Sequence, residues 1–155
     1  QMAGSFSFGT SVAEVDIDPE TGKITMPRFT AAHDCGRPIN PMAVEGQMDG
    51  SIQQAGVATI TEGNVWDNGF LLNPDLLEYK VPLACDMPEI ETLIVESHDP
   101  DGPFGAKEGG LTVRMNAYSA VACAVTNATG KLFSELPLTP DKVLVLLDDN
   151  KGVKG

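Results

Sequence analysis

Positive charge is scarce in this chain of 155 residues, which has 10 lysines and arginines against 22 aspartates and glutamates and a net charge of −12. Nucleic acids and anionic membrane surfaces both attract clustered cations. The sequence has no such cluster, so we expect neither as a partner. An anionic cofactor is still compatible with this composition, because backbone N–H donors can outweigh the global charge at one site.

Cysteine is also rare, and the three present, Cys35, Cys85 and Cys123, show no CxxC spacing. They provide neither a disulfide framework nor a zinc or iron–sulfur signature, and we expect reduced thiols in a cytoplasmic protein. No apolar run is long enough for a signal peptide or a membrane span. The chain opens on Gln1 without an initiator Met, which indicates a segment or a processed piece of something larger.

The first third of the chain has the pattern of a β-hairpin. Apolar and polar residues alternate in residues 5–17, residues 18–23 (DPETGK) have turn chemistry, and residues 23–32 return as a second strand. Two strands around so short a turn are antiparallel. Pro27 lacks an N–H donor and is expected at an edge or a bulge.

A long helix is predicted next, after a loop at residues 33–41. Asn40 is the expected N-cap, Pro41 the first helical residue, and apolar spacing continues to about residue 62. Three glycines interrupt this helix, each costing about 1 kcal/mol relative to alanine: Gly46, Gly50 and Gly56. We expect them where something approaches the helix closely, most simply the sheet.

The remainder continues the α+β pattern. The predicted elements are a hairpin turning at Asn68-Gly69, a strand over 90–95, a helix over 112–129 with a buried stripe (Ala117, Ala120, Val121, Ala124, Val125 and Ala128), its C-cap at Gly130, and a short helix from Thr139. Residues 76–81 are ambiguous. The predicted fold is one α+β lobe over residues 1–147, with antiparallel hairpins packed with two long helices and a frayed tail over 148–155.

Residues 102–110 (GPFGAKEGG), between the predicted strand and the second long helix, are the main candidate for a functional loop. Glycines allow close backbone approach, and the following helix start offers unpaired N–H groups to an anion. Composition alone is equally compatible with a plain connection. The loop is not a P-loop, because Lys107 follows Ala106 and precedes Glu108, with no Ser or Thr after the lysine.

Other candidate chemistry is weaker. Neighbouring residues in extended chain point to opposite sides, so neither His33-Asp34-Cys35 nor His98-Asp99 is a ready-made metal site, and a joint site would need the two loops to meet. No protein-ligated metal is expected. The surroundings of Cys35 match no pattern for a nucleophile.

Glu108 allows two interpretations. Desolvation in a glycine loop would raise its pKa and make it an acid–base catalyst. The favoured alternative is a solvent-facing carboxylate paired to Lys107.

The ordered series AEVDIDPETGKI, HDCGRPINPMAVEGQMDGSIQQAG, LLEYKVPLACDMPEIETLIVES, GPFGAKEGG and AVTNATGKLFSELPLTPDKVL resembles the molybdenum hydroxylase family of xanthine dehydrogenases and aldehyde oxidoreductases. It looks like the C-terminal part of the large, molybdopterin-binding subunit, and GPFGAKE is most similar to the 4-hydroxybenzoyl-CoA reductase branch. The resemblance implies an oxidoreductase that acts on a heterocyclic, aldehyde or aromatic-CoA substrate.

The resemblance also implies a site. Molybdenum would be held by molybdopterin, expected as the cytosine dinucleotide, and not by protein side chains. The implied cofactor-binding residues are Gly46, Gln47, Gly105, Ala106, Lys107, Gly109, Gly110 and Leu111. The implied partners are the remainder of the subunit and the subunits or domains that carry iron–sulfur clusters and FAD. The chain alone is expected to be inactive.

The sequence departs from the family at the position of its glutamate base, which is Leu111 here. Leu111 also supports an alternative function, a non-catalytic structural or assembly subunit. Three explanations of Leu111 stay open: Glu108, three residues earlier, takes over as the catalytic base; the substrate or reaction differs and needs no such base; or the subunit is catalytically impaired. The second explanation is slightly favoured.

Overall fold

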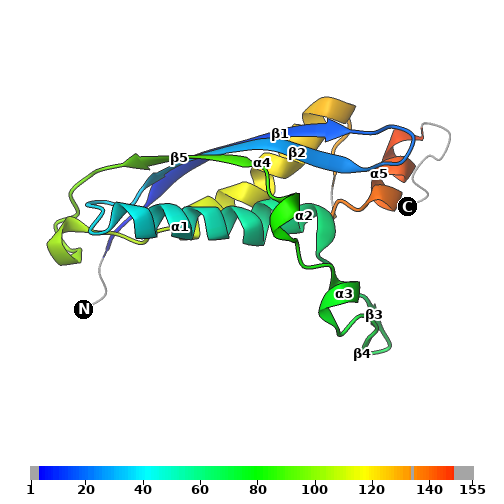
Figure 1. The fold of residues 1–155 in the computed structure, drawn as a ribbon, viewed down its shortest axis with the longest axis horizontal. Coiled ribbons are helices and arrows are strands. Elements are labelled where there is room, and N and C mark those ends of the chain that lie inside the picture. Colours follow the sequence, from blue (N-terminus) through cyan, green and yellow to red (C-terminus); the bar gives the residue numbers. More distant parts are fainter. Residues whose placement is uncertain (1–3, 134, 149–155) are drawn as a thin grey trace.

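The computed structural model describes residues 4–133 and 135–148, and shows a three-stranded sheet with helices on one face (Figure 1). The elements in chain order are β1 (Phe8–Ile17), β2 (Ile24–Asp34), α1 (Pro41–Ser51), η1 (Ile52–Val57), α2 (Ala58–Thr61), β3 (Trp66–Asp67), β4 (Phe70–Leu71), α3 (Leu76–Tyr79), η2 (Ala84–Asp86), β5 (Glu89–Val95), η3 (Pro103–Gly105), α4 (Leu111–Thr129) and α5 (Pro140–Leu147). The strand order is β1-β2-β5. The α+β prediction is confirmed.

The predicted hairpin is confirmed, since β1 and β2 are antiparallel around a turn in which Gly22 has φ of +71°. The pairing register shifts between Glu14, opposite Arg28, and Asp16, opposite Thr25. Pro27 therefore lies on the longer side of a bulge, where its missing N–H donor leaves the ladder intact.

β2 is longer than predicted and has a second partner. It runs parallel to β5, and this pairing reaches His33, opposite Ile94, and Asp34, opposite Val95. The placement of these two residues in a loop was therefore wrong. Because β5 comes much later in the chain than β2, no local sequence pattern indicates that the two strands pair.

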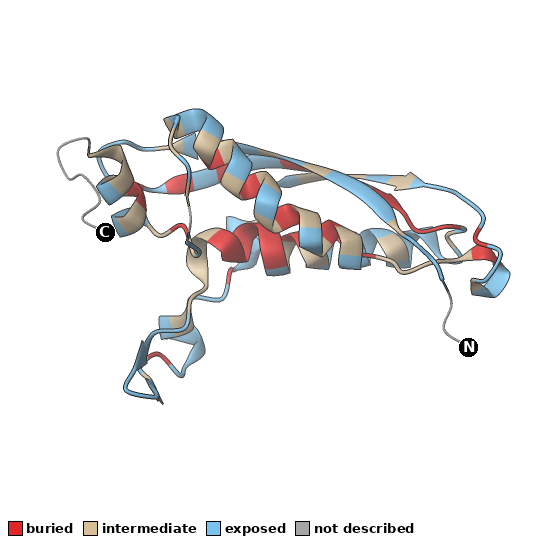
Figure 2. Ribbon diagram, turned by 180° about the vertical axis from the view of Figure 1, so that it is seen from behind, coloured by how far each residue is buried: buried red, intermediate tan, exposed pale blue. Residues whose placement is uncertain are grey.

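The two long helices are confirmed, and Figure 2 shows buried residues along both of them. α1, η1 and α2 form one continuous helical segment that contains a π-helical stretch, in which the N–H of Ala58 donates to the carbonyl of Gln53. Asn40 caps it as predicted, because its Oδ1 accepts from the N–H of Ala43 at 3.2 Å. Gly130, with φ of +69°, ends α4.

The core lies between the helices and the inner face of the sheet, and includes Phe29, Ala31, Met48, Ile52, Val113, Ala117, Val121 and Val125. On α4 the buried positions recur every four residues from Val113 to Val125. Ala128 lies off this line and is exposed, so its predicted place in the stripe was wrong.

The three helix glycines divide into two kinds. A Cβ on Gly56 would lie 3.4 Å from the ring of Phe29, which confirms close packing on the sheet. Gly46 and Gly50 are exposed, and a Cβ on either would meet nothing within 4 Å. Packing on the sheet therefore does not explain these two glycines.

Between α2 and β5 the chain leaves the body of the fold. We call residues 64–83 the arm; it carries β3, β4 and α3 and extends away from the sheet on the helix side (Figure 1). The predicted Asn68-Gly69 turn is confirmed, with φ of 45° and 86°. Of the helices in the described ranges, none is long and apolar enough to cross a membrane. α5 ends at Leu147 with Asp148 as its C-cap, and the rest of the predicted tail lies outside the described residues.

Candidate functional site

Two loops meet at the carboxyl end of β2. The backbone N–H of Lys107 donates to the carbonyl of Cys35 at 2.8 Å, and the N–H of Arg37 donates to the carbonyl of Gly105 at 2.9 Å. These bonds join the segment between β2 and α1 to the glycine-rich loop before α4. The loop is therefore fixed against the sheet along its backbone.

A buried ion pair strengthens this junction. Lys107 Nζ lies 2.6 Å from Asp34 Oδ2, and the two side chains are only 7% and 12% exposed. Asp34 Oδ1 also accepts from Ser97 Oγ at 2.7 Å and from the N–H of Gly36 at 2.9 Å. Burial alone would raise the pKa of Asp34, but these donors outweigh it and lower the pKa to about 2. We call this group the clamp.

Glu108 occupies the start of α4. Its carboxylate accepts from the N–H of Leu111 at 2.6 Å, and from the N–H and Oγ1 of Thr112 at 3.1 and 2.6 Å. Burial would raise the pKa of Glu108, but these bonds, with His33 nearby at 3.6 Å, lower it instead. The anion at this helix start is thus a side chain of the loop itself.

Both predicted environments for Glu108 were therefore wrong. Its pKa is lowered, not raised, because of three hydrogen bonds that sequence spacing did not indicate. Lys107 pairs with Asp34, 73 positions away, and not with its neighbour Glu108. Buried His33 holds the loop from the inner side, with Nε2 donating to the carbonyl of Glu108 at 2.9 Å.

A hollow of about 370 Å³ opens between α1 and these two loops, and we call it the loop hollow. Its lining residues are Cys35, Arg37, Ile39, Asn40, Ala43, Val44, Gln47, Ala106, Lys107 and Gly109. No carboxylate lines it, although the chain is strongly acidic. Two cations, Lys107 and Arg37, line the hollow. Lys107 is neutralised by Asp34, whereas Arg37 has no ion-pair partner among the described residues.

The loop hollow brings together four of the predicted cofactor-binding residues: Gln47, Ala106, Lys107 and Gly109. Lys107 turns its ammonium away toward Asp34 and the carbonyl of Phe6. The other predicted residues, Gly46, Gly105, Glu108, Gly110 and Leu111, do not line it. Leu111, where the resemblance predicts a glutamate, is 59% exposed at the first turn of α4.

Two glycines shape the loop and do not line the hollow. Gly110 has φ of +135°, and a Cβ there would lie 3.0 Å from the carbonyl oxygen of Gln47 and 2.9 Å from Ser51 Oγ. Gly105 is buried with φ of +86°, where a Cβ would collide with the ring of His98. Glycine at position 110 thus lets the loop touch α1 beside Gln47.

The donors around the loop hollow fit a pterin cofactor. The Gln47 amide is exposed and has no described partner, so it can both donate and accept a hydrogen bond. Of the lining residues, Gly109 has a backbone N–H for which no described residue is an acceptor. Arg37 adds positive charge for a phosphate. The sequence analysis did not select Arg37. The feature that could have identified it is its position, since it is a cation just before the predicted helix in a strongly acidic chain.

The described residues do not form a metal cluster, and Cys35 is not an activated thiol. No three His, Cys, Asp or Glu side chains in the described ranges are placed to hold a metal ion. Cys35 is 2% exposed, and burial raises the pKa of its thiol, which opposes a role as a thiolate nucleophile.

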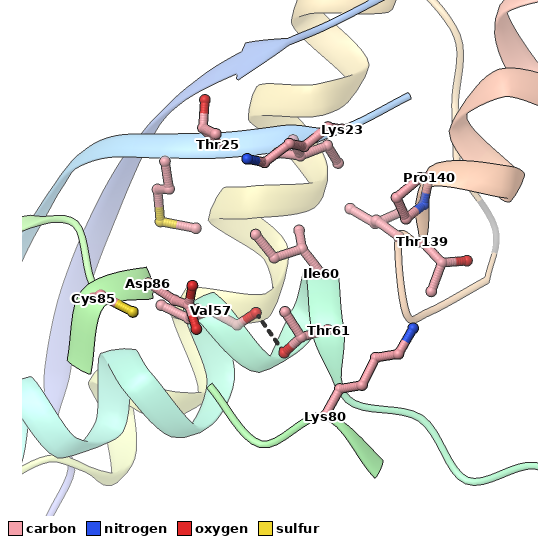
Figure 3. A pocket seen from close by; sticks show the side chains of 13 residues that line it. Lys23, Thr25, Val57, Ile60, Thr61, Lys80, Cys85, Asp86, Thr139 and Pro140 are labelled. Atoms are coloured by element: carbon pink, nitrogen blue, oxygen red, sulfur yellow. Dashed lines mark hydrogen bonds between the residues drawn. The ribbon is translucent and has the colours of Figure 1, made fainter. Parts of the chain in front are cut away.

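A second hollow, of about 410 Å³, lies at the far end of the sheet and contains none of the predicted site residues. We call it the far hollow. Its lining includes apolar Val57, Ile60 and Leu138, and Figure 3 shows Lys23 and Lys80 on different sides of it. Neither ammonium has a partner among the described residues.

Comparisons with known proteins agree with the resemblance. A family model described as "Molybdopterin cofactor-binding domain" matches residues 1–88. The chain is 32% identical over 139 residues to the putative xanthine dehydrogenase molybdenum-binding subunit XdhA of Escherichia coli K12, covering 88% of this chain and 18% of that protein. It is 33% identical to the aldehyde oxidoreductase molybdenum-binding subunit PaoC of the same organism, covering 92% of this chain and 20% of PaoC.

Solved structures share the fold. The Cu,Mo-CO dehydrogenase matches with a TM-score of 0.83 and 28% identity, over 90% of this chain and 18% of that chain. Quinoline 2-oxidoreductase from Pseudomonas putida 86 matches with a TM-score of 0.81 and 33% identity, over 87% of this chain and 18% of that chain. The chain spans about one-fifth of these relatives' length. It belongs to the family of molybdopterin cofactor-binding domains found in xanthine dehydrogenases, aldehyde oxidoreductases and CO dehydrogenases.

Proposed function

We propose that this chain forms one wall of the cofactor site in a molybdenum-dependent oxidoreductase of the hydroxylase type. The supporting observation is the loop hollow, where Gln47 of α1 meets Ala106, Lys107 and Gly109 of the glycine-rich loop and no carboxylate lines the space. When bound, molybdopterin would hold the molybdenum that exchanges electrons with the substrate. The protein residues orient the cofactor and exclude competing contacts.

Each residue of the wall has a defined role in this proposal. The Gln47 amide donates to and accepts from the pterin edge, and the backbone N–H of Gly109 donates to one of its oxygen acceptors. Gly105, Gly110 and the clamp fix the loop, so these donors are preorganised before the cofactor arrives. Arg37 faces the anionic portion. Gly46 leaves the exposed surface of α1 open beside Gln47.

The catalytic base is a separate question. Position 111 is leucine, so Glu108 is the remaining candidate within the loop. Its three hydrogen bonds at the start of α4 favour a holding role over proton transfer. We therefore favour a reaction that takes no proton to a carboxylate of this loop, and Glu108 as a base is the alternative.

Finer features of the enzyme are proposals from resemblance. The loop GPFGAKE favours a place near the 4-hydroxybenzoyl-CoA reductases, and a heterocyclic, aldehyde or aromatic-CoA substrate. The cofactor would be the cytosine dinucleotide form, with iron–sulfur clusters and FAD on partner chains in a cytoplasmic complex. The lobe would comprise residues 1–147. A chain one-fifth as long as its relatives would be inactive alone, because most of the cofactor's contacts come from elsewhere.

A second candidate function is a structural subunit that keeps the fold without the chemistry, and Leu111 is the observation that favours it. The test is to purify the tagged chain from its source and measure molybdenum, iron and flavin in the complex. Molybdenum with substrate-dependent reduction of an electron acceptor supports the oxidoreductase. A stable complex that contains the rest of the subunit but no molybdenum supports the structural role.

A further inference from the structure

His33 lies near the carboxyl end of β2, under the glycine-rich loop. β2 is the middle strand of the sheet, and His33 is opposite Gly9 of β1 on one side and Ile94 of β5 on the other (Figure 1). Its side chain is completely buried. Strand pairing on both sides fixes the backbone and close packing fixes the ring, so the imidazole has a set position before any ligand binds.

Gly9 lets the start of α4 approach the sheet beside His33. A Cβ at position 9 would lie 2.8 Å from Thr112 Cγ2. Thr112 in turn donates to the carboxylate of Glu108 from its N–H at 3.1 Å and from Oγ1 at 2.6 Å. The end of the glycine-rich loop is therefore held at a fixed distance from the sheet, with the carbonyl of Glu108 2.9 Å from His33 Nε2.

The hydrogen bond to Glu108 determines which nitrogen of the imidazole carries the proton. A carbonyl oxygen can only accept, so the proton is on Nε2. Nδ1 is buried and has no hydrogen-bond partner among the described residues. A proton on Nδ1 would be a buried donor without an acceptor, which is costly. His33 therefore acts on the loop as a donor through Nε2 alone.

The accepting carbonyl belongs to the same peptide unit as the N–H of Gly109. This peptide bond is trans, so its C=O and N–H point in opposite directions. Because His33 holds the carbonyl on the inner side, the N–H of Gly109 points outward. Gly109 lines the loop hollow and His33 does not, and no described residue accepts from this N–H. A hydrogen bond to the carbonyl also polarises the amide and makes its N–H a stronger donor.

We propose that His33 is a positioning residue of the cofactor wall, which orients the Glu108–Gly109 peptide so that the N–H of Gly109 points into the loop hollow toward an oxygen of the pterin cofactor. This inference rests on the proposed function. It also gives a reason for an imidazole on the inner face of β2, where Phe29 and Ala31, which share that face, are apolar. A side chain needed only for packing would not require a buried polar ring there.

Two substitutions separate the hydrogen-bond donor from the packing. Glutamine and methionine are both unbranched and similar in length, but the glutamine amide places an N–H near the position of Nε2 and methionine has no donor. His33→Gln and His33→Met are made in the full chain, and urea unfolding verifies that each variant folds. The tagged complexes are purified from the source, and the rate at which molybdenum and pterin are released through a filtration membrane is measured.

A second measurement does not depend on the cofactor. Heteronuclear NMR of the isotope-labelled full chain reports which imidazole nitrogen of His33 carries the proton, and it reports the resonance of the Gly109 amide nitrogen. We expect the proton on Nε2. We also expect the Gly109 resonance to move in His33→Met, where the preceding carbonyl loses its donor, and to stay in place in His33→Gln.

The proposal predicts that His33→Met releases the cofactor about fivefold faster than the unchanged complex, because an oriented donor is lost, and that His33→Gln stays within about twofold. Equal release from the two variants, or a proton on Nδ1, overturns it. If neither variant folds, the position of the imidazole proton decides the result. A complex that contains the rest of the subunit but no molybdenum overturns the proposed function, and the Gly109 resonance then decides separately whether His33 orients the peptide.

Discussion

The loop hollow and the far hollow are similar in size, about 370 and 410 Å³, but they are built from different chemistry. The far hollow is bordered by apolar side chains and by lysines without described partners. The loop hollow is bordered by backbone of a glycine-rich loop and by an amide, Gln47. The larger volume does not identify the site. We place the proposed site at the loop hollow because it offers unpaired hydrogen-bond donors on a fixed backbone.

The two hollows also differ in whether the charged side chains beside them have interaction partners. Beside the loop hollow, Asp34, Lys107 and Glu108 are all committed to specific partners, which fixes the loop. Beside the far hollow, the ammonium groups of Lys23 and Lys80 have no interaction partner among the described residues. The comparison indicates that the charged side chains at the loop end are fixed by partners and that the two lysines at the far end are not, and the following experiments test that difference.

The largest expected effect comes from breaking the clamp. Lys107→Met leaves the Asp34 carboxylate buried without its cation, and should lower the free energy of unfolding by about 3 kcal/mol. Lys23→Met, at the far hollow, should change it by less than about 0.5 kcal/mol. Urea unfolding of both variants measures the difference, and equal effects would remove the distinction between the two ends.

Acid should weaken the clamp in a defined pH window. The pKa of Asp34 is about 2 in the folded chain and near 3.8 when unfolded, so its contribution is present above pH 3.8 and lost as pH falls through 2. That loss is about 2 kcal/mol for a shift of this size. Unfolding followed between pH 5 and 2 should show a smaller loss for Lys107→Met. An equal slope in both proteins would show that Asp34 is not the group responsible.

Two glycines should respond with opposite signs. Gly110→Ala forces a Cβ against α1 at positive φ and should cost about 2 kcal/mol of stability. Gly46→Ala, on the exposed face of α1, should instead stabilise the isolated chain by about 0.5–1 kcal/mol. Thermal unfolding distinguishes these outcomes. A neutral Gly110→Ala would mean that the loop does not rest on α1.

A modest change in stability is expected at Glu108. Glu108→Gln keeps the shape but loses the charge at the start of α4, and should cost about 1 kcal/mol at pH 7. Because the pKa of Glu108 is lowered on folding, this difference should shrink as pH falls through the folded pKa. In the assembled enzyme, a base role predicts turnover reduced about 10²-fold or more, whereas a holding role leaves the pH profile of turnover unchanged.

Local patterns in the sequence predicted much of the fold. The alternation before Ile17, the Asn40 cap, the Asn68-Gly69 turn and the Gly130 C-cap each depend on neighbours within a few residues. Ordinary turn and cap chemistry therefore sufficed to place the β1–β2 hairpin and both long helices. The position of the glycine-rich loop between β5 and α4 was predicted for the same reason.

The features that the sequence did not predict depend on contacts between residues far apart in the chain. The parallel pairing of β2 with β5 turned His33 and Asp34 into strand residues, and only that placement brings Asp34 to Lys107. Without it, Lys107 and Glu108 look like a neighbouring pair. The resemblance supplied Gln47 and the loop as site residues, but the structure was needed to show that they border one hollow with Arg37.

The most direct test of the proposed cofactor wall compares two glutamines of one helical segment in the assembled complex. Gln47 borders the loop hollow, and Gln54 is exposed two turns later. Molybdenum and pterin are quantified per complex for Gln47→Ala and Gln54→Ala. The account predicts that Gln47→Ala lowers cofactor content about tenfold, because the hydrogen bonds of the amide to the cofactor are lost, while Gln54→Ala does not change it. Full molybdenum and pterin content in Gln47→Ala would contradict the account.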